Sequence, residues 1–171
     1  MNSQDLRIGH GYDAHRFETP DVQGAKGKPL ILGGVIIPHD RGLLAHSDGD
    51  VLIHALCDAL LGALGAGDIG QHFPDHDAQY RNIDSSLLLG EVMKLVKQGN
   101  WQVINVDLTV VAQAPKLAAH MPAMVQGLAG LLAVTADRIN IKATTTEGMG
   151  FVGRKEGIAS YAVVLLGRAA K

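Results

Sequence analysis

Three side chains of this sequence could share one metal ion. Asp13 and His15 are two residues apart in a segment that is typical of a strand, so both side chains would point to the same face. His54 follows near the start of an apolar helical pattern and could supply a third ligand. One carboxylate and two imidazoles suit zinc and leave one coordination position open. An open position favours chemistry on a bound ligand over a purely structural metal.

The helical pattern that carries His54 also carries two carboxylates. Asp50, His54 and Asp58 recur every four residues and would share one helix face. On this pattern, Asp58 could accept a hydrogen bond from the imidazole and orient it. The alternative is a solvated polar stripe, but the helix is otherwise apolar, and buried carboxylates need partners.

A second group of polar residues, 144–154, follows an expected strand and could bind phosphate. Its threonine hydroxyls and the backbone N–H groups of its glycines can hold phosphate oxygens. Arg154 can neutralise them, and Glu147 can hold a hard cation such as Mg²⁺. A strand end followed by a glycine-rich turn would explain the threonines and glycines, but not the Glu147 and Arg154 pair.

Two further segments have ambiguous patterns. Residues 112–116 join a strand to an expected helix, where Lys116 adds charge to a helix N-terminus that favours anions. Taken alone, a plain junction with a solvated lysine is the favoured interpretation. In the acidic loops 67–70 and 73–77, Asp68 could bind a sugar diol, or the loops could simply be solvated. The sequence contains no Walker A loop, no Rossmann glycine pattern and no nucleophile elbow.

Length and composition favour one domain over residues 1–171. A formal net charge of −2 argues against a nucleic-acid partner. The single cysteine excludes an intrachain disulfide, and the first residues lack signal-peptide character, so we expect a cytoplasmic protein. No run approaches the roughly 20 apolar residues of a membrane helix. Charged residues make up only 19%, which favours an oligomer that hides part of its surface.

Hydrophobic periodicity predicts an α+β fold, an α/β sandwich with helices packed on one face of a mixed β-sheet. Strands are expected over 7–15, 29–32, 35–38, 101–112, 139–144 and 158–166. Helices are expected over 48–64, 85–98 and 115–132, the first with Ser47 or Asp48 as its N-cap. In the strand 101–112, Ile104 would share the buried face with Val106. Residues 17–28 are expected to form a mobile loop, and 68–82 a polar one.

Five blocks together resemble the 2-C-methyl-D-erythritol 2,4-cyclodiphosphate synthase family, at residues 9–15, 43–50, 67–70, 112–116 and 142–147. The resemblance runs from about residue 7 to the end of the chain, in order and at the right spacing. It implies a lyase of the non-mevalonate isoprenoid pathway. The substrate would be 4-diphosphocytidyl-2-C-methyl-D-erythritol 2-phosphate, and the products the cyclic diphosphate and CMP. Since the substrate's own 2-phosphate would attack the β-phosphorus, the protein would need no nucleophile.

The resemblance also implies roles for single residues. Zinc, or another divalent transition metal, would bind Asp13, His15 and His54, and Mg²⁺ or Mn²⁺ would bind Glu147 and the substrate diphosphate. His46 and Thr145 would be catalytic through stabilisation of the transition state. The implied substrate-binding residues are Asp13, Ala14, His15, His46, Ser47, Asp68, Ile69, Gly70, Phe73, Pro74, Asp75, His76, Asp77, Ala112, Gln113, Ala114, Pro115, Lys116, Leu117, Ala118, Thr144, Thr145, Thr146, Glu147, Phe151 and Arg154.

The family resemblance implies a homotrimer with active sites between neighbouring subunits and a central cavity that can hold an isoprenoid diphosphate. Arg154 and Glu156 match positions near that cavity. Tyr12 stands where phenylalanine is common in the family, and Val152 where threonine is common. We expect these two differences to affect the binding of isoprenoid diphosphate in the cavity and to leave catalysis intact. Two alternatives stay open: a zinc-dependent phosphohydrolase, in which the metal activates water, and a trimeric isoprenoid-diphosphate-binding module with a structural metal.

Overall fold

A computed structural model describes residues 5–19, 27–74 and 76–169 of the chain. Residues 20–26 of the expected loop 17–28, and Asp75 of the expected substrate loop, lie outside the described residues. The elements, in chain order, are β1 (Leu6–Arg16), β2 (Leu30–Leu32), β3 (Val35–Ile37), α1 (Val51–Leu64), α2 (Ile69–His72), a 3₁₀ turn (Ala78–Tyr80), α3 (Ser85–Gln98), β4 (Trp101–Val111), α4 (Met121–Leu132), a second 3₁₀ turn (Ala136–Arg138), β5 (Ile139–Thr144), α5 (Gly150–Gly153) and β6 (Gly157–Arg168).

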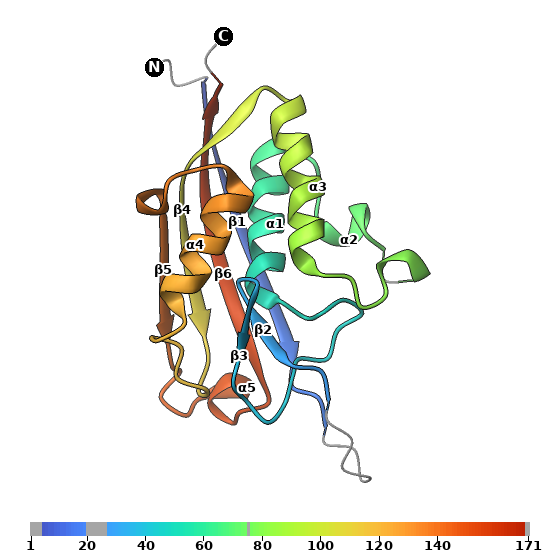
Figure 1. Ribbon diagram of the computed structural model, residues 1–171, viewed down its shortest axis with the longest axis vertical. Helices are drawn as coiled ribbons and strands as arrows, with labels where there is room; N and C mark the ends of the chain where they lie inside the picture. Colours follow the sequence, from blue (N-terminus) through green and yellow to red (C-terminus); the bar gives the residue numbers. More distant parts are fainter. Residues whose placement is uncertain (1–4, 20–26, 75, 170–171) are drawn as a thin grey trace.

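The main sheet has four strands in the order β1-β6-β4-β5. β6 pairs antiparallel with both β1 and β4, whereas β4 and β5 are parallel, so the sheet is mixed. Helices α1, α3 and α4 lie together on one side of it (Figure 1). The predicted α+β architecture, with helices on one face of a mixed sheet, is therefore confirmed. The hairpin β2–β3 forms a separate two-stranded sheet, as its glycine turn predicts.

Two glycines of β1 allow α1 to lie directly against the sheet. A Cβ atom at Gly9 would fall 1.8 Å from the backbone oxygen of Ala59, and one at Gly11 would fall 1.9 Å from that of Ala55. Because side chains alternate along a strand, the next residues on the same face are Asp13 and His15. The close contact therefore places these two side chains over the first turns of α1.

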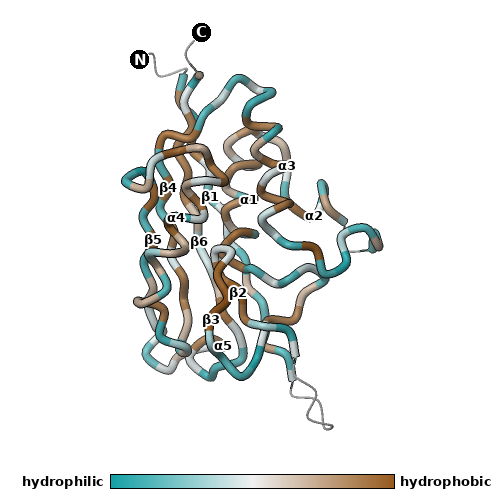
Figure 2. Tube along the Cα trace, viewed as in Figure 1, coloured by the Kyte–Doolittle hydropathy of each residue, from teal (hydrophilic) through white to brown (hydrophobic). Residues whose placement is uncertain are grey.

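The hydrophobic core lies between the sheet and these helices (Figure 2). In β4, Val106, Leu108 and Val110 are buried, as their alternation predicts. The prediction that Ile104 joins them is wrong. A β-bulge between Val103 and Asn105 shifts the alternation, so Val103 is buried and Ile104 is partly exposed.

Several element boundaries differ from the predictions, and local contacts explain three of the differences. α1 begins at Val51, because Asp50 is the N-cap and accepts the N–H groups of Leu52 and Ile53. The expected helix 115–132 begins only at Met121, with Pro122 in its first turn, where a proline costs no hydrogen bond. The loop expected from residue 17 begins later, because Phe17 is buried and bridges to Leu43.

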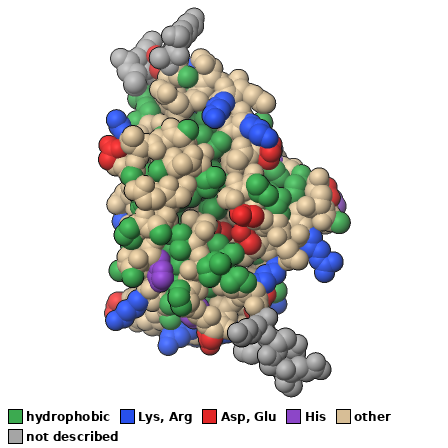
Figure 3. All heavy atoms as spheres, viewed as in Figure 1, with side chains coloured by type: hydrophobic (Ala, Val, Ile, Leu, Met, Phe, Trp, Pro, Cys, Tyr) green, Lys and Arg blue, Asp and Glu red, His purple; other side chains and the backbone are tan. Residues whose placement is uncertain are grey.

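The surface of the helix-bearing side is mixed. Figure 3 shows hydrophobic side chains over the middle of this side, with lysine and arginine side chains dispersed toward its edges. Within the described ranges, no helix combines the length and the apolar composition needed to cross a membrane.

Candidate active site

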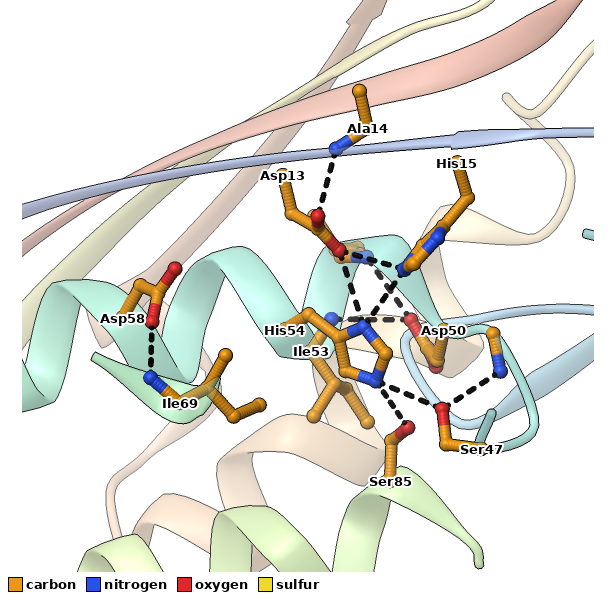
Figure 4. A network of polar contacts seen from close by, with 12 residues as sticks. Asp13, Ala14, His15, Ser47, Asp50, Ile53, His54, Asp58, Ile69 and Ser85 are labelled. Atoms are coloured by element: carbon orange, nitrogen blue, oxygen red, sulfur yellow. Dashed lines mark hydrogen bonds and ion pairs between the residues drawn. The ribbon is translucent and has the colours of Figure 1, made fainter. Parts of the chain in front are cut away.

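The three predicted ligands meet at the end of β1 and the start of α1 (Figure 4). The Oδ2 atom of Asp13 lies 2.9 Å from His15 Nε2 and 3.1 Å from His54 Nδ1, and the two nitrogens are 3.0 Å apart. Metal–ligand bonds of 2.0–2.1 Å in tetrahedral geometry separate ligand atoms by about 3.3 Å. The triangle is therefore close to the size that a small divalent cation requires.

The charges of these groups are strongly coupled. Burial opposes ionisation of Asp13, but hydrogen bonds from His15 and His54 hold the pKa of its carboxyl well below the usual range. Burial likewise disfavours a charged His54, yet the neighbouring carboxylate of Asp13 raises the pKa of the imidazole above its ordinary value. The site thus favours positive charge between these side chains, which a metal ion supplies without a proton.

The second ring nitrogen of His54 is also bound. Its Nε2 atom lies 2.9 Å from Ser85 Oγ and 3.1 Å from Ser47 Oγ (Figure 4). Sequence reasoning missed Ser85, because a serine at the start of a helix is a common cap, and only the packing of α3 on α1 brings it to His54. The prediction that Asp58 orients His54 is wrong. Asp58 lies one helical turn after His54, and its Oδ1 accepts the backbone N–H of Ile69 at 2.7 Å.

Asp50, the other carboxylate of the expected stripe, stabilises the fold. It is fully buried, and its two oxygens accept N–H groups from Gly33, Gly34, Leu52 and Ile53. Burial raises the pKa of its carboxyl to about 6. The polar stripe is therefore a set of separate contacts rather than one solvated face.

A cavity of about 360 Å³ opens beside the metal-ligand triangle. It is lined by Asp13, His15, Leu44, Ala45, His46, Ser47, His54, Ile69, Gly70, Phe73, Tyr80, Ile83 and Leu88. Eight of these residues come from the sequence-predicted site. The other five, mainly apolar, were missed because apolar residues of a cavity wall have the same sequence pattern as core residues.

In the acidic loop after α1, some residues line the cavity, whereas two of the carboxylates bind within the loop itself. Ile69, Gly70 and Phe73 line the cavity. Asp68 is the N-cap of α2, and its carboxylate accepts the backbone N–H and the side-chain amide of Gln71. Asp77 accepts equivalent bonds from Gln79, and its carbonyl oxygen lies 3.3 Å from His46 Nε2. Both carboxylates thus have partners within their own turns.

The predicted phosphate segments form a second cluster. The Gly148 N–H donates to Gln113 Oε1 at 3.4 Å, and the Ala112 N–H donates to the Thr144 carbonyl at 2.9 Å, so the two segments are adjacent. Thr145 Oγ1 donates to Glu147 Oε1 at 2.7 Å.

The second cluster follows β4 and β5, whereas the metal-ligand triangle lies on β1 at the other edge of the sheet. Described residues of 112–118 and 144–154 are absent from the lining of the 360 Å³ cavity. Arg154 pairs with Glu156 at 2.7 and 3.1 Å, and the Phe151 side chain is 39% exposed. One chain therefore contains both halves of the predicted site, but holds them apart.

The described residues thus combine a mixed-sheet α+β fold with a carboxylate and two imidazoles that could hold a divalent metal ion beside a cavity, an arrangement typical of metal-assisted enzymes. The chain belongs to the YgbB family, whose model matches residues 6–167. A relative from Nitrosococcus oceani, named 2-C-methyl-D-erythritol 2,4-cyclodiphosphate synthase, is 60% identical over 94% of this chain and 98% of its own length. The family resemblance of the sequence motifs is thus confirmed.

Solved structures agree with this assignment. An IspF–CDP complex from Plasmodium falciparum superposes with a TM-score of 0.83 at 34% identity, covering 99% of this chain and 100% of that one. The bifunctional IspDF from Campylobacter jejuni superposes with a TM-score of 0.88 at 45% identity over 95% of this chain. This chain spans 42% of the length of that bifunctional protein.

Proposed function

We propose that this chain converts 4-diphosphocytidyl-2-C-methyl-D-erythritol 2-phosphate into 2-C-methyl-D-erythritol 2,4-cyclodiphosphate and CMP. The observation that carries the proposal is the Asp13–His15–His54 triangle beside a cavity, in a chain whose relatives bear the name of this synthase. In the reaction an oxygen of the 2-phosphate attacks the β-phosphorus. The bond from that phosphorus to the CMP oxygen breaks, and CMP leaves with the electron pair.

Both reacting groups belong to the substrate, so the protein contributes position and charge stabilisation. Zinc, or another divalent transition metal, would be held by the triangle and would supply Lewis-acid polarisation of a phosphate oxygen. Glu147 would hold Mg²⁺ or Mn²⁺ on the diphosphate. His46 and Ser47 line the cavity next to the triangle, where they can donate hydrogen bonds to a phosphate.

The apolar wall of the cavity suits the carbon skeleton of the substrate. Ile69, Phe73, Tyr80 and Leu88 line the cavity, and none of them carries a charged group. Such a wall excludes water from the attacking phosphate, which favours cyclisation over hydrolysis.

We further propose that the complete site forms between subunits of a homotrimer. Two observations support it. The second cluster, with Gln113, Thr145 and Glu147, lies apart from the cavity within one chain. The sheet face opposite the helices carries exposed apolar side chains, with Ile8 72% and Tyr12 45% exposed, which an oligomer could bury.

In such a trimer the segment 112–118 of one subunit, with 144–147, Phe151 and Arg154, would hold the cytidine and diphosphate beside the neighbour's metal. The Plasmodium falciparum relative is described as a CDP complex, which supports a nucleotide pocket of this kind. The sheet faces would enclose the central cavity, and exposed Tyr12 would be this chain's departure from the common pattern there. Val152, the other departure, lies in α5 and is buried within the chain.

The test is the His54→Ala variant. We expect this variant to form no product and to remain a folded oligomer of unchanged mass. Product formation is measured by ³¹P NMR. Release of CMP with an uncyclised product by the native protein would instead indicate the phosphohydrolase. An unfolded or dissociated variant would favour the binding module with a structural metal, and a fully active variant would exclude the zinc role.

A further inference from the structure

We propose that Ser85 and Asp48 form a hydrogen-bond relay that positions the His54 imidazole, so that Nδ1 and not Nε2 faces the metal-ligand triangle. The relay rests on the proposed metal site. It gives a role to a buried serine that the sequence pattern did not single out. Ser85 would be a positioning residue, since it acts on the ligand His54 and does not line the cavity.

The contacts of Ser85 form a continuous chain. It is the first residue of α3, and its side chain is fully buried. Its Oγ atom lies 2.9 Å from His54 Nε2 and 2.5 Å from Asp48 Oδ1. The backbone N–H of Ser85 donates to the other oxygen, Asp48 Oδ2, at 3.0 Å. Serine and aspartate are therefore locked to each other by two bonds.

The direction of each proton follows from what these groups can donate. An ionised carboxylate only accepts hydrogen bonds, so the Ser85 hydroxyl hydrogen points to Asp48. The Ser85 oxygen then has only lone pairs to offer His54, and Nε2 must carry the hydrogen. A neutral imidazole that is protonated at Nε2 presents its lone pair at Nδ1. That is the atom lying 3.0 Å from His15 Nε2 and 3.1 Å from Asp13 Oδ2.

Asp48 itself is held in place from several sides. Its Oδ1 also accepts the Asp50 N–H at 3.2 Å, and its own backbone N–H donates to the Ile83 carbonyl at 3.0 Å. A carboxylate that accepts from a hydroxyl makes the hydroxyl oxygen a stronger acceptor for the imidazole N–H, and this makes the ring a better ligand. The relay therefore joins the start of α3 and the loop before α1 to the metal-ligand triangle.

Ser47, the other hydroxyl near Nε2, has a different position. Its Oγ lies 3.1 Å from Nε2 and accepts the Gly49 N–H at 3.1 Å, and it lines the cavity. Its hydroxyl hydrogen is not directed to a carboxylate in these contacts, so it stays available to a phosphate in the cavity. The two serines would therefore have different roles: Ser85 orients His54, and Ser47 faces the substrate.

The experiment compares Ser85→Ala with Ser86→Ala in the full-length protein. Ser86 lies on the same turn of α3, but its backbone N–H donates to Asp84 outside the relay. Zinc affinity is measured by competition with a chromophoric chelator. We expect Ser85→Ala to weaken zinc binding about 10- to 100-fold, Asp48→Asn to weaken it less, and Ser86→Ala to leave it unchanged. Ser85→Thr, which keeps the hydroxyl, should restore most of the affinity.

A second measurement separates the relay from simple packing. In the zinc-loaded protein, NMR should show the His54 Nε2–H proton as a resonance protected from exchange with water. Ser85→Ala should shift that resonance upfield and speed its exchange, whereas Ser86→Ala should not. Wild-type zinc affinity together with an unchanged Nε2–H resonance in Ser85→Ala would overturn the relay. If Ser85→Ala does not fold, Asp48→Asn is judged by the same two measurements.

Failure of the proposed function is distinguishable from failure of the relay. If the protein binds zinc with the predicted dependence on Ser85 but forms no cyclic product, the relay is supported and the proposed reaction is contradicted. If the protein forms the cyclic product but its zinc affinity and Nε2–H resonance do not change in Ser85→Ala, the proposed reaction is supported and the relay is contradicted.

Discussion

His15 Nε2 and His54 Nδ1 lie 3.0 Å apart, with Asp13 Oδ2 within 3.1 Å of both nitrogens. Two lone pairs at that distance repel each other, so the arrangement is stable only with a proton or a cation between the rings. The Asp13 carboxylate adds a negative charge to the same point. The metal-free protein must therefore hold extra protons there or spread the triangle apart.

Removal of the metal should accordingly lower thermal stability. Zinc that binds only the folded state stabilises it by about 4 kcal/mol at 1,000 times its dissociation constant. For a domain of this size that corresponds to a rise of roughly 10 °C in Tm. Thermal melts with a chelator and with added zinc check this. His54→Ala should melt at one temperature under both conditions, and a zinc-dependent Tm in that variant would contradict the assignment.

Zinc affinity should rise with pH. The Asp13 carboxylate raises the pKa of the His54 imidazole despite its burial, and the metal can bind the ring only after that proton leaves. Below this raised pKa each binding event must release a proton, so affinity falls as pH falls. Above it the proton is already gone and the dependence flattens. Chelator competition from pH 5 to 8 measures the slope, and a flat profile over that range would contradict the coupling.

Lys28 should support the loop that carries His46. Its Nζ donates to the carbonyl oxygens of Ala45, at 3.0 Å, and of Ser47, at 2.8 Å, on either side of His46. Lys28→Met keeps the apolar stem but frees the loop, and small displacements of positioned groups reduce rates by roughly 10- to 100-fold. We expect kcat to fall by about that factor while zinc affinity is unchanged.

Two variants control the Lys28 experiment. Lys28→Arg retains donors and should recover part of kcat. Lys94→Met removes an exposed lysine that pairs with Glu91 on α3, and it should behave as wild type. If Lys28→Met lowers zinc affinity as much as it lowers kcat, the lysine acts on the metal-ligand triangle and not on the loop.

Gly11→Ala should destabilise the fold strongly. The added Cβ would lie 1.9 Å from the Ala55 carbonyl oxygen, so β1 and α1 would have to separate. Overpacking of this kind costs about 1–3 kcal/mol, and more when backbone must move. The matched control is Gly130→Ala, at an exposed position of α4 where an added Cβ meets nothing within 4 Å. That change should stabilise the helix by about 0.5–1 kcal/mol. Urea unfolding of both variants gives the comparison, and equal midpoints would contradict the close contact.

Local pattern predicted the parts of the site that depend on one element at a time. The two-residue spacing of Asp13 and His15, and the position of His54 early in a helix, follow from strand and helix periods. The contacts of Asp58, the bulge at Ile104 and the role of Ser85 depend on how separate elements pack. Asp58 binds Ile69 because α2 begins against α1, and nothing in the spacing around Asp58 encodes that.

A mixing experiment tests the proposal that the site forms between subunits. His54→Ala removes the metal-ligand half and Glu147→Ala removes the other half, so each variant alone should be inactive. If each complete site takes one half from each of two neighbouring subunits, randomly mixed trimers should contain about a quarter of the wild-type number of intact sites. Co-expressed variants should therefore regain roughly that share of activity, measured as CMP release.

The control for the mixing experiment combines His54→Ala with His15→Ala. Both changes disable the metal-ligand half, so no pairing of these subunits can produce an intact site. Recovery in the first mixture and not in the second would place the halves on different subunits. Inactivity of both mixtures, with native mass spectrometry showing mixed oligomers, would mean that a single chain must bring its Glu147 segment to its own metal. Within one chain that segment follows β5 and the metal-ligand triangle lies on β1, at opposite edges of the sheet, so the loop after β5 would have to reach past the ends of β4 and β6.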